Sequence, residues 1–340
     1  MENLKIKEFK TNPNIKFKQK LKVMSCCFGI NDIFDIYYSI KDNNELYLIS
    51  PDENYTISIT RIRDNQLIKS LEPYEKNIRM VKHFFNEKDS KDYLIVTYLG
   101  SHLNIWNLTD NYKLIHSINI NYSTNSIIYG SLFYFPKNEG DYFLVSSNEA
   151  NENDYTKIYD FRTGLFLENL EKTNIFEIFY LILWNNKNVD YLIECSNSNI
   201  LIHNLVTKKL YRVLHNEKRT IHNSACIIKN AINSNDNLYV LNINGNIDIW
   251  DLENFNYISS IYLKSGYFYH IISWSNRYLF ISEKFNSSII IIDTKANKAI
   301  SLYKNIHKTF VIGLKKIVHP LFGESLLSSD ISNNIFLWTH

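Results

Sequence analysis

The chain has 340 residues, of which 45% are hydrophobic and 14% aromatic, so it has enough apolar surface for a large core. Tyr (24) and Phe (20) far outnumber Met (3) and Pro (5), and this composition favours half-buried strands over helices. The 37 basic and 35 acidic residues leave a net charge of only +2, without the basic footprint of a nucleic-acid-binding protein. No apolar run approaches the roughly 18 residues of a transmembrane helix. We therefore expect no transmembrane segment and no nucleic-acid partner.

Four cysteines, Cys26, Cys27, Cys195 and Cys226, form no CxxC pair and show no spacing typical of a disulfide framework. With no recognisable signal peptide, this pattern predicts reduced thiols in a cytoplasmic protein, with the nucleus as the alternative. Motifs such as HExxH, GxSxG and GxGxxG are missing from the sequence. We therefore expect no catalytic residues, no metal site and no cofactor.

The N-terminus is the one locally basic part of the chain. Residues 1–13 are predicted to be a flexible basic segment, and residues 14–23 (NIKFKQKLKV) alternate as a strand does. Lys16, Lys18, Lys20 and Lys22 fall on one side of that strand, where lysine blocks edge-to-edge pairing. A membrane-binding or nucleic-acid-binding patch is the alternative interpretation of the same lysines.

A repeated pattern follows, and it is clearest in residues 244–261 (NGNIDIWDLENFNYISSI). An Asn-Gly turn leads into an alternating strand that ends at Trp250-Asp251, and a polar turn leads to a second strand. With Trp250 as the anchor, the equivalent positions are Thr60, Trp106, Tyr159, His203, Trp250, Ile292 and Trp338. Successive anchors are 46, 53, 44, 47, 42 and 46 residues apart, which gives seven repeats over residues 14–340 as a single domain.

Each repeat has two apolar runs before its anchor, and six of the seven anchors are followed by a further strand. Four short strands per repeat, bounded by Asn, Ser, Asp and Gly turns, are typical of one blade of a β-propeller. The approximate blades are 33–71, 78–118, 126–170, 175–214, 221–261, 267–303 and 310–339. The last repeat lacks its outer strand, and residues 14–23 supply one. The sequence therefore predicts an all-β ring of seven blades, closed by the N-terminal strand.

The repeats resemble those of the WD40 family over essentially the whole chain. The Trp-Asp dipeptide is present at Trp250-Asp251, and Trp106-Asn107, Tyr159-Asp160, Ile292-Asp293 and Trp338-Thr339 are near matches. In the last repeat His307, Ser328 and Trp338 match the hydrogen-bonded His–Ser–Trp–Asp network of the family, whereas its Asp position holds Ser332. The resemblance implies a seven-bladed propeller of the WD40 type.

The same resemblance implies a non-enzymatic scaffold or adaptor that holds protein or peptide partners, within a multiprotein complex, on the top face of the ring. Loops between blades carry the predicted interaction surface, with the acidic loop 147–154 beside it. Its residues are Tyr74, Lys76, Arg79, Lys218, Arg219, Tyr267 and Lys308. Two alternatives stay open: a propeller that binds phosphoinositides or a membrane surface, and an enzyme with a site in the central channel. A channel lined only by apolar, Asn and Ser residues would exclude the enzyme.

Overall fold

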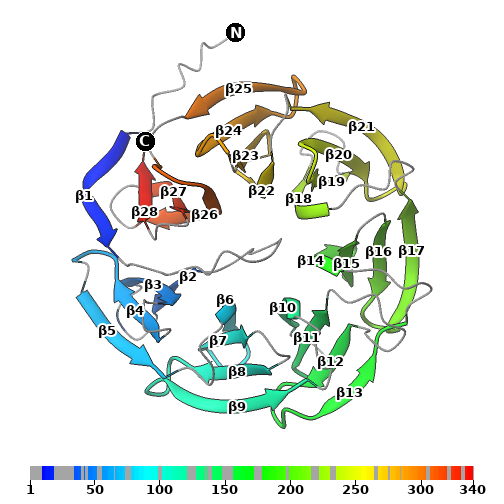
Figure 1. The fold of residues 1–340 in the computed structure, drawn as a ribbon. Helices are drawn as coiled ribbons and strands as arrows, with labels where there is room; N and C mark the ends of the chain where they lie inside the picture. Colours follow the sequence, from blue (N-terminus) through cyan, green and yellow to red (C-terminus); the bar gives the residue numbers. More distant parts are fainter. Residues whose placement is uncertain are drawn as a thin grey trace.

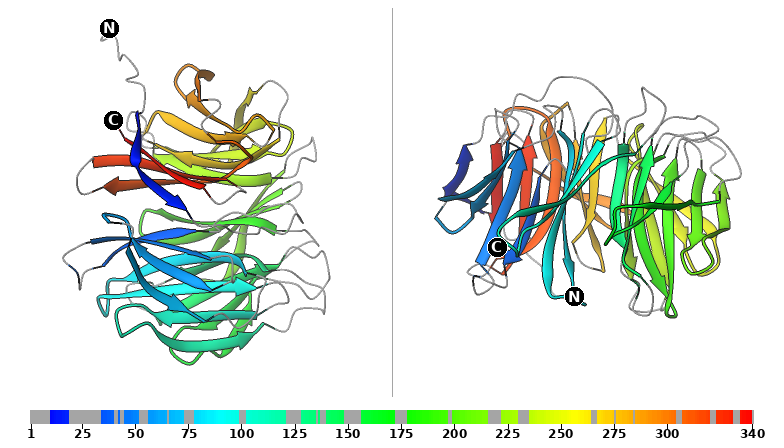
Figure 2. Two further views of the ribbon diagram at one scale, coloured as in Figure 1. Left: turned by 60° about the vertical axis from the view of Figure 1, so that its left-hand side comes forward. Right: turned by 90° about the horizontal axis from the view of Figure 1, so that it is seen from below.

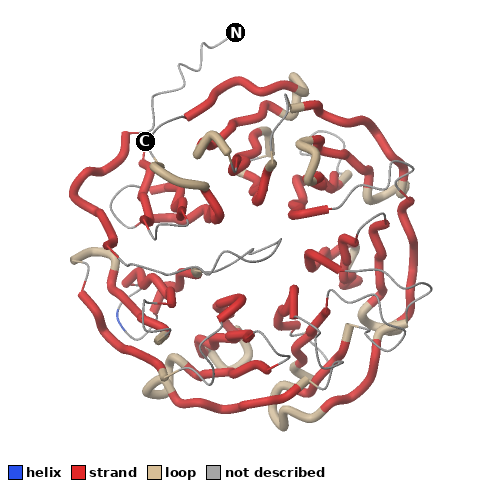
Figure 3. The backbone as a smooth tube through the Cα atoms, in the orientation of Figure 1, coloured by secondary structure: helices blue, strands red, loops and turns tan. Residues whose placement is uncertain are grey.

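The computed structural model describes residues 10–18, 34–39, 42, 45–51, 56–64, 66–72, 78–98, 102–120, 128–134, 136, 140–147, 156–171, 178–196, 199–215, 222–229, 235–263, 267–274, 276–283, 285–303, 307–319, 323–330 and 334–339. These residues form 28 strands and no α-helix. Strands account for most of the described backbone (Figure 3). The predicted all-β fold class is confirmed.

The strands form seven four-stranded antiparallel sheets, which are arranged as the blades of a ring (Figure 1). Blade 1 contains β2 (Asp35–Ser39), β3 (Glu45–Pro51), β4 (Ile57–Arg61) and β5 (Gln66–Leu71). Blade 2 contains β6 (Ile78–Asn86), β7 (Lys91–Tyr98), β8 (His102–Asn107) and β9 (Lys113–Asn119). Blade 3 contains β10 (Ile128–Tyr134), β11 (Tyr142–Ser147), β12 (Lys157–Asp160) and β13 (Phe166–Asn169).

Blade 4 contains β14 (Ile178–Asn186), β15 (Val189–Ser196), β16 (Asn199–Asn204) and β17 (Lys209–His215). Blade 5 contains β18 (His222–Lys229), β19 (Asp236–Asn242), β20 (Asn246–Asp251) and β21 (Asn256–Tyr262). Blade 6 contains β22 (Phe268–Ser273), β23 (Tyr278–Glu283), β24 (Ser288–Asp293) and β25 (Lys298–Tyr303). Blade 7 contains β26 (Val311–His319), β27 (Gly323–Asp330), β28 (Asn334–Thr339) and the N-terminal β1 (Lys10–Lys18).

Strand β1 completes blade 7, as the sequence predicts (Figure 1). It runs antiparallel to β28, with Lys18 opposite Asn334 and Lys10 opposite Thr339, and the register shifts between Thr11 and Lys16. The strand occupies residues 10–18, so it begins before the predicted start at residue 14. Residues 1–9 and 19–23 lie outside the described part of the chain. The first and last strands of the sequence therefore share one blade.

Side chains join blade 7 to blade 1 as well. One buried cluster combines Leu46 and Leu48 of blade 1 with Leu327 and Leu337 of blade 7. Each fully buried Leu contributes on the order of 2 kcal/mol, so packing supplies much of the free energy that closes the ring. The Tyr38 hydroxyl donates to the backbone carbonyl of Val318 (2.5 Å) and accepts from its N–H (2.8 Å). Closure therefore rests on apolar burial, on this tyrosine and on β1.

All seven anchors lie on the third strand of a blade and are buried. In six blades the anchor pairs with a leucine of the second strand, and in blade 3 Tyr159 pairs with Phe143. These partners are at most 1% exposed, which places each anchor against the apolar layer between blades. The polar anchor His203 is hydrogen-bonded to Glu194 (3.1 Å), as expected of a buried imidazole. The predicted anchors are confirmed.

A β-bulge at the anchor is a repeated feature that the sequence did not reveal. In blades 1 to 6 the register between the third and fourth strands shifts at the anchor. The extra residue is always large and apolar: Ile68, Ile115, Leu167, Tyr211, Ile258 and Ile300. A bulge bends its strand and increases its twist. We infer that the bulge curves these six outer strands around the rim of the ring.

Candidate functional site

The antiparallel strands divide the turns between two faces of the ring (Figure 2). We define the upper face as the face that has the connections between blades and the turns from the second to the third strand of each blade. The lower face has the turns from first to second and from third to fourth strand. Six of the seven predicted interaction residues fall in the sequence between the fourth strand of one blade and the first strand of the next, so they are expected on or near the upper face.

Four of the seven predicted residues, Tyr74, Lys76, Lys218 and Arg219, lie outside the described part of the chain, as do residues 148–154 of the acidic loop. The other three are described. Arg79 is half-buried within β6 of blade 2, whereas Tyr267 and Lys308 are next to blades 6 and 7. Tyr267 directly precedes β22 and is 49% exposed, and Lys308 is exposed three residues before β26. Tyr267 and Lys308 therefore mark the described part of the predicted surface.

An aromatic cluster connects Tyr267 with Phe310, which lies two residues after Lys308. The Phe285 ring lies edge-to-face against Tyr267, with centroids 5.1 Å apart, and against Phe310, with centroids 6.0 Å apart. Phe285 is 57% exposed at the turn between β23 and β24, a place where small polar residues are usual. We call Tyr267, Phe285, Lys308 and Phe310 the upper rim site. A phenylalanine inside a predicted turn was the signal that sequence reasoning missed.

A buried hydrogen-bond network fixes the chain segment that carries Lys308 and Phe310. His307 Nδ1 lies 2.9 Å from Asp330 Oδ2, and His307 Nε2 lies 2.7 Å from Ser328 Oγ. The Trp338 indole N–H donates to the same Ser328 Oγ at 2.6 Å. With a neutral imidazole, the Ser328 hydroxyl then donates to Nε2 and the Nδ1–H donates to Asp330. His307 is only 3% exposed and Asp330 is fully buried, so these bonds are shielded from water.

This network confirms the predicted grouping of His307, Ser328 and Trp338 and corrects the identity of its acid. The match to the family's repeat pattern placed the acid at position 332, which holds a serine outside the described residues. Asp330, at the end of β27, makes the contact instead. The acid was missed because its position depends on where β27 ends, and sequence patterns define the ends of strands poorly.

The inner strands of blades 2 to 5 line a cavity of about 470 Å³ in the wall of the central channel. Its lining is mostly apolar, but Lys82 and His83 of β6 also contribute. His83 Nε2 lies 2.9 Å from Asp92 Oδ1, and the His83 ring stacks on Tyr37 with centroids 5.1 Å apart. The channel wall therefore contains titratable groups, and the condition that would exclude an enzyme is not met.

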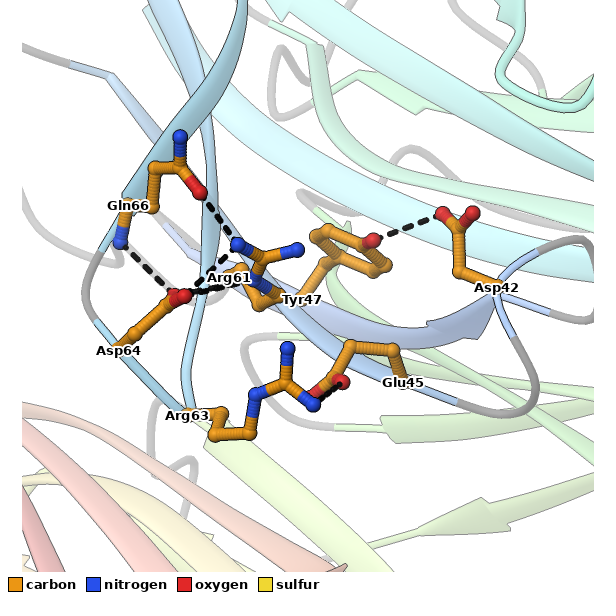
Figure 4. A network of polar contacts seen from close by, with 7 residues as sticks. All are labelled: Asp42, Glu45, Tyr47, Arg61, Arg63, Asp64 and Gln66. Atoms are coloured by element: carbon orange, nitrogen blue, oxygen red, sulfur yellow. Dashed lines mark hydrogen bonds and ion pairs between the residues drawn. The ribbon is translucent and has the colours of Figure 1, made fainter.

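Blade 1 has a polar network at the lower-face turn between β4 and β5 (Figure 4). Arg61 follows the anchor and pairs with Asp64 at 2.7 Å, and Arg63 pairs with Glu45 at 3.0 Å. The hydrogen bond from Arg61 holds the pKa of the Asp64 carboxyl below its usual range, against a smaller opposing effect of burial. Since each arginine already pairs with a carboxylate, we interpret this network as one that stabilises the turn and not as a binding site.

The seven four-stranded sheets, arranged as a ring (Figure 1), define a seven-bladed β-propeller. No protein-family model matches the chain, and no curated protein matches its sequence. The part of the chain that the structure describes contains no helix long and apolar enough to cross a membrane. Within the same residues, no three His, Cys, Asp or Glu side chains are grouped so as to hold a metal ion.

Proposed function

We propose that this propeller is a non-enzymatic scaffold of the WD40 type, which holds a protein or peptide partner on the upper rim of blades 6 and 7. The main observation behind this proposal is the exposed aromatic cluster in which Tyr267 and Phe310 lie edge-to-face against Phe285. Aromatic side chains are enriched in the energetic centres of protein interfaces. A fold alone does not define a function, and the site is therefore the stronger argument.

The geometry suggests how a partner would bind. An apolar side chain of the partner would pack against Phe285 and Tyr267, while an acidic residue beside it would pair with Lys308. The buried bonds of His307 hold this segment before the partner arrives, which lowers the entropic cost of binding. Cys195 and Cys226 are free thiols, which supports a location in the cytoplasm or nucleus.

Affinity purification of the tagged protein from its own cells, with partners quantified by mass spectrometry, tests the proposal. The double variant Tyr267→Ala with Phe285→Ala should lose a stoichiometric partner that the wild type retains. Tyr211→Ala is the matched control, because Tyr211 is 46% exposed on the outer strand β17. A partner that is retained by the double variant would place the interaction elsewhere and reject the proposed site.

Chemistry in the channel is a second candidate function, favoured by the His83–Asp92 pair beside the cavity. A carboxylate that orients an imidazole is a common arrangement for a general base. A thermal-shift screen of small metabolites against the wild type and His83→Ala tests it. A compound that stabilises only the wild type would support channel chemistry, and a screen without such a compound would argue against it.

A further inference from the structure

The outer strands of the seven blades differ in how their free edges are protected. Each of them pairs with a single described strand, which leaves one edge unpaired within the described structure. Charged side chains on such an edge hinder pairing with another chain. Six outer strands contain at least one: Lys10 in β1, Lys69 in β5, Lys113 in β9, Glu168 in β13, Lys209 in β17 and Lys298 in β25. Strand β21 of blade 5, with the sequence NYISSIY, contains none.

The uncharged strand β21 also exposes large apolar side chains. Tyr257 is 50% exposed, Ile258 is 51% exposed and Tyr262 is 66% exposed. The Tyr257 side chain is held by hydrogen bonds, because its hydroxyl is 2.6 Å from Ser260 Oγ, which donates in turn to Asp248. Tyr and Ile are favoured in strands, so the composition of this edge suits pairing with a further strand.

One hydrogen bond at the end of the strand shows which backbone groups of β21 point away from β20. The N–H of Leu263 donates to the carbonyl of Gly245 at 3.2 Å, on the inner side of β21. Residues alternate in direction along an antiparallel ladder. The N–H and C=O groups of Ser260 and Tyr262 therefore point outward, away from β20.

We propose that β21 pairs antiparallel with β21 of a second copy of this chain, around a two-fold axis at Ser260. Residues that face each other in such a pair must project to the same side of the sheet, which allows a register centred on Ser260. Ser260 then exchanges two backbone hydrogen bonds with Ser260 of the partner subunit. Ile258 lies opposite Tyr262 of the partner subunit, in an aliphatic–aromatic pair that the axis generates twice.

The charge pattern favours a second copy as the occupant of this edge. A symmetric strand pair brings the same sequence against itself, so every charged residue risks meeting a like charge across the axis. Strand β21 has no charged residue, so like charges cannot meet in any register of such a pair. Its exposed Ile258 and Tyr262 become buried against each other, which removes apolar surface from water. The dimer leaves the upper rim site of both copies on the ring face and does not depend on it.

Sedimentation equilibrium of the full-length protein over a wide concentration range tests the dimer. We expect a reversible monomer–dimer equilibrium, and Ile258→Lys should shift it to monomer by at least tenfold in dissociation constant. The matched control is Ile115→Lys, at the same bulge position on β9, which should leave the equilibrium unchanged. A wild type that stays monomeric, or a dimer that Ile258→Lys leaves intact, would overturn the proposal.

A second pair of variants gives an answer even if Ile258→Lys does not fold. Hydrogen-bonded cross-strand residues have Cα atoms about 5.5 Å apart, within the range that a disulfide bridges. Ser260→Cys should therefore form a disulfide-linked dimer under mild oxidation, above the background of the wild type. Ser117→Cys, at the equivalent position of β9, should not. Equal cross-linking of the two variants would reject β21 as the interface.

Discussion

Blades 5 and 7 show that the two residues of the Trp-Asp dipeptide have separate tasks. Blade 7 lacks the Asp after Trp338 but has the complete network of Trp338, Ser328, His307 and Asp330. Blade 5 has the dipeptide, but Val240 occupies the position of Ser328, and the indole N–H of Trp250 has no partner within the described structure. A matching dipeptide therefore did not identify the blade with the network.

The Asp of the dipeptide serves the turn that follows it. Asp251 Oδ1 accepts the backbone N–H groups of Glu253 (2.8 Å) and Asn254 (3.1 Å). Asn204 does the same for the N–H groups of Val206 and Thr207, since Asn and Asp both cap turns. In blade 7 the fourth strand is β1, so no turn joins β28 to its outer neighbour. Thr339 can therefore replace the capping residue without loss.

Among the changes that test the difference between blades 5 and 7, removal of β1 should have the largest effect on stability. Blade 5 takes all its strands from one continuous segment, whereas blade 7 depends on residues 10–18. Deleting residues 1–18 should abolish the cooperative melting transition or cause aggregation, because the edge of β28 becomes exposed. Differential scanning calorimetry measures this, with deletion of residues 1–9 as the control. A protein without β1 that melts like the full chain would show that closure does not need the strand.

His307→Ala should destabilise the protein by about 3 kcal/mol, because it leaves the buried Asp330 without its imidazole partner. Denaturant unfolding measures the free energy. His215→Ala is a suitable control, since His215 is exposed at the end of β17. Equal losses in the two variants would mean that the network contributes nothing specific to blade 7.

Blade 5 contains a contrasting histidine, His222, which is fully buried and has no ring-nitrogen partner in the described structure. Burial lowers its pKa to about 4, and nearby Asp248 opposes part of that shift. The unfolded chain therefore binds this proton more readily, so stability is retained above about pH 6.5 and is lost as the pH falls toward 4. The loss should reach about 3 kcal/mol near pH 4.

The variant His222→Leu should remove that part of the pH dependence while it preserves the volume of the side chain. The difference between the unfolding free energies of variant and wild type should shift by about 3 kcal/mol in favour of the variant as the pH falls from 7 to 4. Parallel curves over this range would show that His222 is not the group that titrates.

The smallest expected effect on stability comes from a direct comparison of Trp338 with Trp250. Trp338→Phe removes a hydrogen bond to Ser328, whereas Trp250→Phe removes an N–H that has no partner in the described structure. Both variants lose a similar volume, so Trp338→Phe should cost about 1 kcal/mol more in unfolding free energy. Equal costs would indicate that Trp250 also donates a hydrogen bond in solution.

The sequence predicted those features that repeat along the chain. The period of the anchors was sufficient to predict seven blades. The missing outer strand of the last repeat, together with the extra strand before the first repeat, predicted closure by the N-terminal strand. Both predictions are confirmed. The bulge residues were not predicted, because Ile115 or Ile258 looks like an ordinary strand residue until the opposing strand is known. Regular patterns identify strands, but the register between strands is a property of the folded sheet.

The candidate site was predicted only in part, since it combines residues from separate segments. Tyr267 and Lys308 were predicted from their place between blades, whereas Phe285 and Phe310 were not. Their contacts join residues at least 18 positions apart in the chain, and no local pattern encodes such contacts. Tyr74, Lys76, Lys218 and Arg219 stay predictions.

Hydrogen–deuterium exchange of the full-length protein, with and without its co-purified partner, tests the central claim most directly. Partner binding to the upper rim site should slow exchange in residues 267–274, 285–287 and 307–310, where the aromatic cluster and the His307 network meet. Slower exchange confined to lower-face turns such as 161–165 and 252–255, with the upper rim unchanged, would contradict it.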